Sequence, residues 1–176
     1  MLLRFILSAR MLVSAIILAV LLVACSEAPP ELPFCRQSVK ESTPIASPAG
    51  CIIIQERYLL VVKHRLSGKY DIPAGQGLTN ETAACTAHRE TFEETGLNVE
   101  VTALISQSAT GLQFFSCQKH QGFNAPNSAP PVPFWSSHEI SHVEWIDPYS
   151  ITSKDWRFAD QLVEVRAAFT QAAKKD

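Results

Sequence analysis

The sequence lacks a surplus of positive charge, the residue pattern of a zinc site, and the length for two domains. Its 176 residues carry 15 Lys and Arg against 17 Asp and Glu, which argues against nucleic acid as a partner. There is no CxxC pair and no histidine cluster at zinc spacing, so a structural zinc cage is disfavoured. The apolar run from Met11 to Ala24 is too short to span a bilayer comfortably. What remains is enough chain for one domain with a proper core.

The amino terminus has the pattern of a secretory signal peptide. Arg4 and Arg10 are the only charges in residues 1–24, and an apolar run follows them. The run closes on LVAC, which resembles the bacterial lipobox, where the cysteine, here Cys25, is acylated and becomes the first residue of the mature chain. A cysteine there by accident is the alternative. In lipoproteins a serine at the next position, here Ser26, permits release to the outer membrane.

The segment after the signal predicts a tether. Residues 25–49 are rich in Pro, Ser and Glu, so we expect them to connect a lipidated Cys25 flexibly to a domain at residues 50–176. The lipobox resemblance implies a lipid anchor in the membrane at the periplasmic face of the bacterial envelope, and Ser26 favours the outer membrane. Two of the 15 basic residues lie in the predicted signal, so the chain from Cys25 onward has 13 basic residues against 17 acidic ones. Its net charge is therefore about −4.

Alternating and β-branched runs predict the strands of the domain. Residues 51–65, CIIIQERYLLVVKHR, give two such runs around a polar Gln-Glu-Arg, which predicts a hairpin. Residues 97–109 and 111–119 alternate well enough to be strands, and residues 142–148 predict a short last strand.

Two segments predict helices. Residues 81–95 contain no Gly or Pro and follow Thr79 and Asn80, either of which could cap a helix, while Gly96 is placed to end it. Residues 154–174 carry apolar side chains at roughly helical spacing, which predicts a helix that packs on the core.

Four cysteines besides Cys25 allow two disulfides, with three connectivities. Cys85 lies on the first predicted helix, on the side away from the sheet, and is poorly aimed at a cysteine on a strand. Its readiest partner is therefore Cys35 in the tether. That leaves Cys51 with Cys117, a pair that requires neighbouring strands with Cα atoms within about 7 Å.

Three glutamates share one face of the first predicted helix. At about 100° per residue, Glu90, Glu93 and Glu94 fall within one stripe, while small residues occupy the neighbouring face. A solvated helix would place Lys or Arg at four-residue spacing to relieve this repulsion, and only Arg89 is near. An exposed acidic face is the alternative. Divalent cations offset such charge better, because Mg²⁺ prefers oxygen ligands and is held by carboxylates together with substrate phosphates.

The frame around these glutamates resembles the Nudix box, G-x5-E-x7-R-E-U-x-E-E-x-G-U, where U is a bulky apolar residue. The sequence matches it at Gly75, at Glu81 and along RETFEETGL, residues 89–97. The one departure is Thr91, where a bulky aliphatic residue is usual. The flanking segments KYDIPAGQ and EISHVEWID also look like those of the family, so the resemblance runs from about Gly50 to the last helix.

The resemblance implies an α/β fold, a sandwich of α/β/α layers around a mixed β-sheet. It implies hydrolysis of a nucleoside diphosphate linked to another moiety, or of a related pyrophosphate, with Mg²⁺ or Mn²⁺ as cofactor. Glu93 and Glu94 would be the principal metal ligands, Glu90 a further ligand or the general base, and Arg89 an orienting residue. The full set of implied metal-site residues is Gly75, Glu81, Glu90, Glu93 and Glu94.

In several Nudix enzymes a later loop supplies the base or another ligand. Glu139, in the polar stretch SSHEISH, and Glu144, in a predicted strand, are the candidates here, and we favour Glu139. An ordinary exposed loop acid is the alternative for it. The pair Phe134-Trp135 either stacks on a nucleobase or packs in the core.

A second hypothesis from another class is a catalytically idle Nudix fold that binds a nucleotide or regulates the envelope as a lipoprotein. The complete set of Glu90, Glu93 and Glu94 speaks against it, because a module freed from catalysis has no need of all three. The sequence does not indicate which pyrophosphate is the substrate or how many copies assemble.

Overall fold

The computed structural model describes residues 30–39, 46–119 and 128–174. The predicted signal peptide, Cys25 and part of the predicted tether lie outside these residues. From Glu31 onward the described residues belong to one compact unit. Within the described ranges, no helix combines the length and the apolar character needed to cross a bilayer.

The first sheet has the strand order β5-β1-β7-β6. Its strands are β5 (Ala74–Gly75), β1 (Ala49–Ile52), β7 (Gln113–Lys119) and β6 (Val99–Gln107). β1 and β7 run parallel, whereas β5 pairs with β1 and β6 pairs with β7 in the antiparallel direction. The sheet is therefore mixed, and β6 and β7 confirm the two strands predicted from alternation.

The second sheet is built around β3 (Tyr58–His64). This strand pairs antiparallel with β2 (Ile54–Gln55), β4 (Tyr70–Asp71) and β8 (Ile140–Ile146). The predicted hairpin is present between β2 and β3, and Glu56 makes its turn with a left-handed φ of 57°. Its first run is divided, because β1 belongs to one sheet and β2 to the other.

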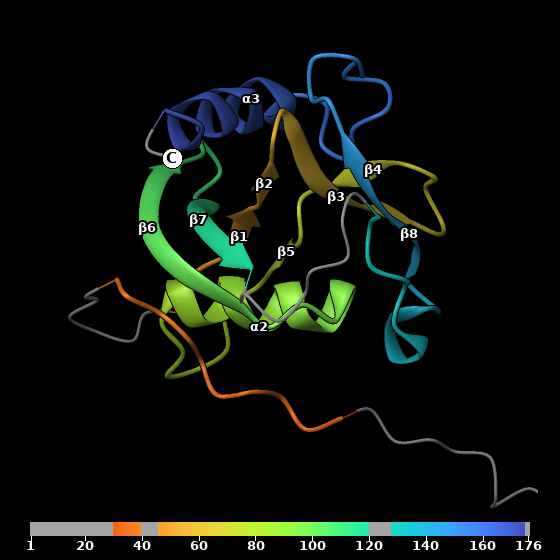
Figure 1. The fold of residues 1–176 in the computed structure, drawn as a ribbon. Helices are drawn as coiled ribbons and strands as arrows, with labels where there is room; N and C mark the ends of the chain where they lie inside the picture. The colour runs from red at the N-terminus through yellow and green to blue at the C-terminus, as the bar shows by residue number, and fades with distance from the viewer. Residues whose placement is uncertain (1–29, 40–45, 120–127, 175–176) are drawn as a thin grey trace, which may run out of the picture. The chain divides into compact units, whose positions relative to one another are not determined.

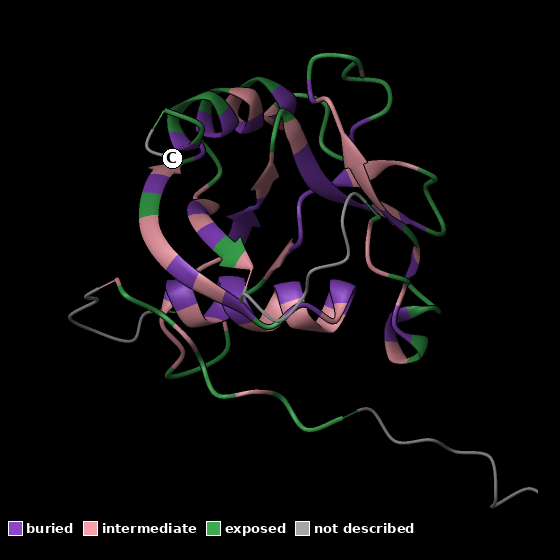
Figure 2. Cartoon of the chain, in the orientation of Figure 1, coloured by how far each residue is buried: buried purple, intermediate pink, exposed green. Residues whose placement is uncertain are grey.

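Two helices cover opposite sides of the strands, α2 (Ala83–Thr95) on one side and α3 (Gln161–Ala172) on the other (Figure 1). The period-2 alternation of β3 supplies both cores, and its side chains are buried on both faces (Figure 2). Leu60 and Val62 join the core beneath α2, whereas Leu59 and Val61 join the core beneath α3. The α/β/α sandwich around a mixed sheet is confirmed.

The structure corrects the start of the first helix and confirms its end. Thr82, rather than Thr79 or Asn80, is the N-cap, because its side-chain oxygen accepts the N–H of Cys85 at 3.2 Å. Asn80 has a left-handed φ of 66°, which does not suit an N-cap. Gly96 ends α2 with φ 74° and donates its N–H to the Phe92 carbonyl.

The last helix is shorter than residues 154–174. α3 begins only at Gln161, because the backbone just before it pairs with β4: Tyr70 donates its N–H to Asp155, and Arg157 donates its N–H to Tyr70, each at 2.8 Å. Trp156, between those two bonds, is fully buried in the core beneath α3. Trp156, Leu162, Val165 and Phe169 are core residues, as predicted, whereas Phe158 and Val163 are exposed. The first part of the segment is extended.

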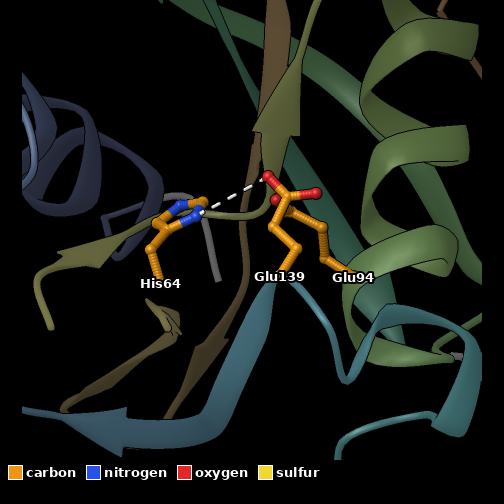
Figure 3. Close-up of side chains that lie close together, drawn as sticks. All are labelled: His64, Glu94 and Glu139. Atoms are coloured by element: carbon orange, nitrogen blue, oxygen red, sulfur yellow. Dashed lines mark ion pairs between the residues drawn. The ribbon is translucent and has the colours of Figure 1, made fainter. Parts of the chain in front are cut away.

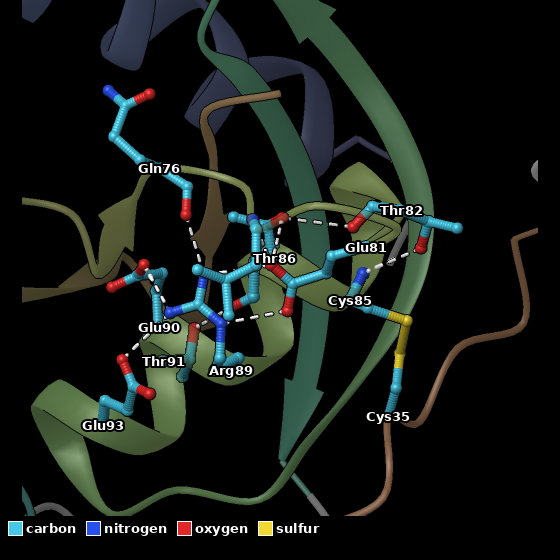
Figure 4. Close-up of polar contacts among 12 residues, drawn as sticks. Cys35, Gln76, Glu81, Thr82, Cys85, Thr86, Arg89, Glu90, Thr91 and Glu93 are labelled. Carbon is cyan, nitrogen blue, oxygen red and sulfur yellow. Dashed lines mark hydrogen bonds and ion pairs between the residues drawn. A yellow bond between two sulfur atoms is a disulfide. The ribbon is translucent and has the colours of Figure 1, made fainter. Parts of the chain in front are cut away.

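The two disulfides join the cysteines in the favoured pairing. Cys35 is bonded to Cys85 of α2, with Cα atoms 5.3 Å apart (Figure 4), and Cys51 to Cys117, with Cα atoms 5.5 Å apart. The residues around Cys35 also pair with β6, since Val101 donates to Arg36 and accepts from Ser38. Part of the predicted tether is therefore held against the domain.

We expect both disulfides to stabilise the fold. Reduction should lower the free energy of unfolding by about 2–5 kcal/mol for each bridge, because each one restricts the unfolded chain. Urea unfolding of the oxidised protein, of Cys35→Ser/Cys85→Ser and of Cys51→Ala/Cys117→Ala separates the two contributions. Peptide mapping without reductant provides the control. Four free thiols, or Cys35 linked to Cys51, would contradict the pairing.

Candidate active site

Arg89 is the centre of a network of carboxylates on α2 and the loop before it (Figure 4). Its Nε and Nη2 donate to the two carboxylate oxygens of Glu81 at 2.9 and 3.0 Å, which makes a bidentate pair. Its Nη1 donates to Glu90 at 2.6 Å and to Glu93 at 3.0 Å, and Nη2 also donates to the Gln76 carbonyl at 2.8 Å. One guanidinium thus holds three glutamates of the predicted set in place.

The Arg89–Glu81 pair stays ionised. Burial works against the charge of Arg89, but hydrogen bonds to Glu81 and the charge of Glu90 outweigh it and raise the pKa of the guanidinium. Burial likewise works against the Glu81 carboxylate, and the Arg89 hydrogen bonds, with the N–H of Leu78, nevertheless hold its pKa below the usual value.

Glu94 is the most deeply buried acid of the network, with only 7% of its surface exposed. Burial raises its pKa well above the usual range, and the nearby negative charges of Glu90 and Asp71 add to this effect. Its Oε2 accepts the Ala74 N–H at 3.1 Å. Burial also raises the pKa of Glu90, against the charge of Arg89. This end of the site has more negative charge than its own cations neutralise.

Gly75 lies on β5 where the strand passes directly over the carboxylate of Glu90. A Cβ atom at this position would lie 2.2 Å from the Glu90 Cδ, so no larger residue fits without displacing that carboxylate. The glycine lets the backbone of β5 approach the acidic stripe of α2.

Glu139 lies beside the acidic stripe, in the loop between the 3₁₀ turn η1 (Phe134–Ser136) and β8. Ligand atoms of Glu139, Glu94 and His64 all lie within 4.8 Å of one another, and the three side chains converge (Figure 3). The other candidate, Glu144, is engaged elsewhere, because it accepts the hydroxyl of Tyr70 at 3.2 Å. The structure therefore brings Glu139 to the predicted site and leaves Glu144 outside it.

The loop that carries Glu139 is docked on α2. Trp135 donates its Nε1–H to the Glu93 carbonyl at 2.9 Å and stacks on Phe92, with ring centroids 5.8 Å apart. From the other side, Arg65 donates through Nε to the Ser137 carbonyl at 2.7 Å. The aromatic pair does not pack in the core, because Phe134 is 47% exposed and Trp135 is only partly buried. Trp135 instead packs on α2 and positions the loop.

Comparison with known proteins agrees with this geometry. The NUDIX domain family matches residues 45–168, which is most of the chain. The chain belongs to the NUDIX domain family. It is 26% identical over 113 residues to a MutT-like protein of Streptomyces ambofaciens, an alignment that covers 61% of this chain and 67% of that protein.

Solved structures share the fold of this NUDIX domain. The crystal structure of an ADP-ribose pyrophosphatase from Streptococcus suis has a TM-score of 0.58 and 18% identity, over 75% of this chain and 93% of that one. A UDP-X diphosphatase has a TM-score of 0.59 and 14% identity, over 78% of this chain and 66% of that one. Family membership supports the predicted enzyme class, a Nudix pyrophosphohydrolase acting on acid anhydrides.

Three residues at the NUDIX site were missed by the sequence analysis: His64, Asp71 and Arg157. The Nη1 of Arg157 lies 3.1 Å from Nε2 of His64 and 4.0 Å from the Asp71 carboxylate. Burial raises the pKa of Asp71 to about 7, although the hydrogen bond from the N–H of Ile72 and the charge of Arg157 both lower it. Burial and the charge of Arg157 lower the pKa of His64, against the charge of Glu139. No local pattern signals this group, because its members come from distant segments.

The donor set fits a hard divalent cation. Carboxylate oxygens predominate, the buried Glu94 has a raised pKa that a cation would relieve, and the missing Cβ of Gly75 opens the strand backbone to the acidic stripe. The residues that would hold Mg²⁺ or Mn²⁺ are Glu90, Glu93 and Glu94, with Glu139 beside them.

Proposed function

We propose that this NUDIX protein is a Mg²⁺- or Mn²⁺-dependent hydrolase. Its substrate would be a nucleoside diphosphate derivative or a related pyrophosphate, and it would act at the periplasmic face of the bacterial envelope, anchored by lipid on Cys25. The observation that carries the catalytic part is the convergence of Glu139 with the buried Glu94, next to glutamates that Arg89 holds in place.

Each residue has a role that its contacts support. Arg89 fixes the orientation of Glu90 and Glu93 through Nη1 and ties them to Glu81. A bound divalent cation would neutralise charge on the phosphoryl oxygens and lower the pKa of a bound water. Glu139 is 54% exposed at its side chain, so its carboxylate can accept a proton from an attacking water.

The substrate class follows from chemistry and from the neighbours in structure. One structural neighbour is named an ADP-ribose pyrophosphatase and the other a UDP-X diphosphatase, and both names refer to nucleoside diphosphate derivatives. We therefore propose a nucleoside diphosphate linked to a second group as the first class to test. The measurement is the release of phosphate monoesters from ADP-ribose and UDP-sugars, and of inorganic phosphate from inorganic pyrophosphate, each with Mg²⁺ or with EDTA. Nucleotide binding without turnover on any of them would favour the idle module.

The anchoring part has its own test. Cys25→Ala should remove acylation and release the chain from the membrane fraction, because the lipid would be the attachment. Cell fractionation with immunoblotting measures this, and Cys25→Ala should leave the turnover of the folded domain unchanged. Retention of the variant in membranes would show that the apolar amino-terminal run is itself the anchor.

A further inference from the structure

His64 enters the site from the end of β3. The alternation of that strand places His64 on the same face as Leu60 and Val62, the face covered by α2. The pairing of β3 with β8 shifts register after Lys63, so Ile140 rather than Ser141 lies opposite His64. Glu139 directly precedes Ile140, and the shift therefore brings Glu139 next to the imidazole.

Both ring nitrogens of His64 face a charged group. Nε2 lies 3.1 Å from Nη1 of Arg157, and Nδ1 lies 3.8 Å from Oε1 of Glu139. Arginine has only donors, so Nε2 must be the acceptor in its contact with Arg157. In a neutral imidazole the one ring proton then resides on Nδ1, where it faces the Glu139 carboxylate.

We propose that His64 is a positioning residue for Glu139: Arg157 fixes its proton on Nδ1, and this N–H holds the Glu139 carboxylate toward Glu94. The proposal rests on the proposed hydrolase function. The Nδ1–Oε1 separation of 3.8 Å is longer than a hydrogen bond. The proposal requires this separation to shorten in the substrate complex, as catalytic hydrogen bonds commonly do.

The competing role for His64 is that of a metal ligand, together with Glu94 and Glu139. Ligation through Nδ1 requires a lone pair on that atom, and the ring proton would then move to Nε2. An N–H there would point at the N–H of Arg157. The two roles thus place the proton on different nitrogens and make opposite predictions for metal affinity.

The first test is spectroscopic and independent of turnover. Long-range proton–nitrogen correlation spectra of the metal-free full mature chain should show His64 protonated on Nδ1 and not on Nε2. The His64 signals are identified by their loss in His64→Asn. In Arg157→Met the preference for Nδ1 should be lost. A ring protonated on Nε2 in the wild type would overturn the proposal.

The second test separates positioning from ligation. His64→Leu should lower kcat about 10–100-fold at unchanged KM, while Mn²⁺ affinity, measured by spin-resonance titration, stays at the wild-type value. His64→Asn, whose amide N–H can take the place of Nδ1–H, should recover most of kcat, and His64→Gln should not. His142→Leu, on the exposed side of β8, is the matched control.

The outcomes distinguish this proposal from the proposed function. An unchanged kcat in His64→Leu, or a large loss of Mn²⁺ affinity, overturns the positioning role while the hydrolase stands. Absence of turnover in the wild type overturns the hydrolase, and with it the positioning role in catalysis, whatever the position of the ring proton.

Discussion

Glu94→Gln is expected to lower Mg²⁺-dependent turnover by about a thousandfold without unfolding the protein. Glutamine keeps an oxygen that can accept the Ala74 N–H but loses the negative charge offered to a cation. Because burial raises the pKa of Glu94, the ionised side chain is unfavourable in the metal-free fold. The metal-free variant should therefore melt at the wild-type temperature or above it.

Two measurements check this expectation, initial rates across a Mg²⁺ series and thermal melting with and without Mg²⁺. Added Mg²⁺ should raise the melting temperature of the wild type more than that of the variant. Glu164→Gln on α3 is the matched control, because that carboxylate also accepts a backbone N–H, from Ala109 at 2.8 Å, but lies across the sheet. If Glu94→Gln kept most of the wild-type turnover, this would contradict a role of the Nudix box in the mechanism.

Arg89→Met should destabilise the fold strongly. The Arg89 side chain is 11% exposed and its guanidinium is shared by three glutamates, so its removal leaves partly buried carboxylates without a counter-charge. Loss of one partner from such a network typically costs about 3–5 kcal/mol. Urea unfolding of the metal-free protein measures the loss, and Mg²⁺ should restore part of it because a cation can take over the neutralisation.

Two further variants sharpen that result. Arg89→Lys keeps the charge but not the fork that grips Glu81, so its stability should lie between those of the wild type and Arg89→Met. Arg166 is the matched control, because its side chain donates to the carbonyls of Pro148 and Ile151. Arg166→Met should therefore destabilise the fold without any recovery in Mg²⁺. Equal stability of Arg89→Met and the wild type would contradict the role assigned to Arg89.

The sequence predicted the parts of the site that one helix contains. The spacing of Glu90, Glu93 and Glu94 follows from helical periodicity, and Gly96 marks the end of the helix correctly. The departure from the box at Thr91 is absorbed locally: its hydroxyl is buried and donates to the Ala87 carbonyl at 2.7 Å, so it needs no partner in the sheet.

The parts that depend on distant segments were beyond the sequence. Trp156 and Arg157 lie in a stretch whose apolar spacing predicted a helix, but hydrogen bonds to β4 keep their backbone extended. That extension places Arg157 against His64, 93 residues earlier in the chain. Pairing with β4, rather than local propensity, decided the conformation of this side of the site.

The Cys35–Cys85 bridge changes what a break in the backbone would do. It gives the segment around Cys35 a second covalent connection to α2, apart from the peptide chain between the two cysteines. A protease that cuts once between residues 36 and 84 would leave two polypeptides still joined through sulfur. On a denaturing gel the nicked protein would migrate as one species without reductant and as two fragments with it. The amino-terminal segment would therefore stay attached to α2 even after the backbone between them is cut.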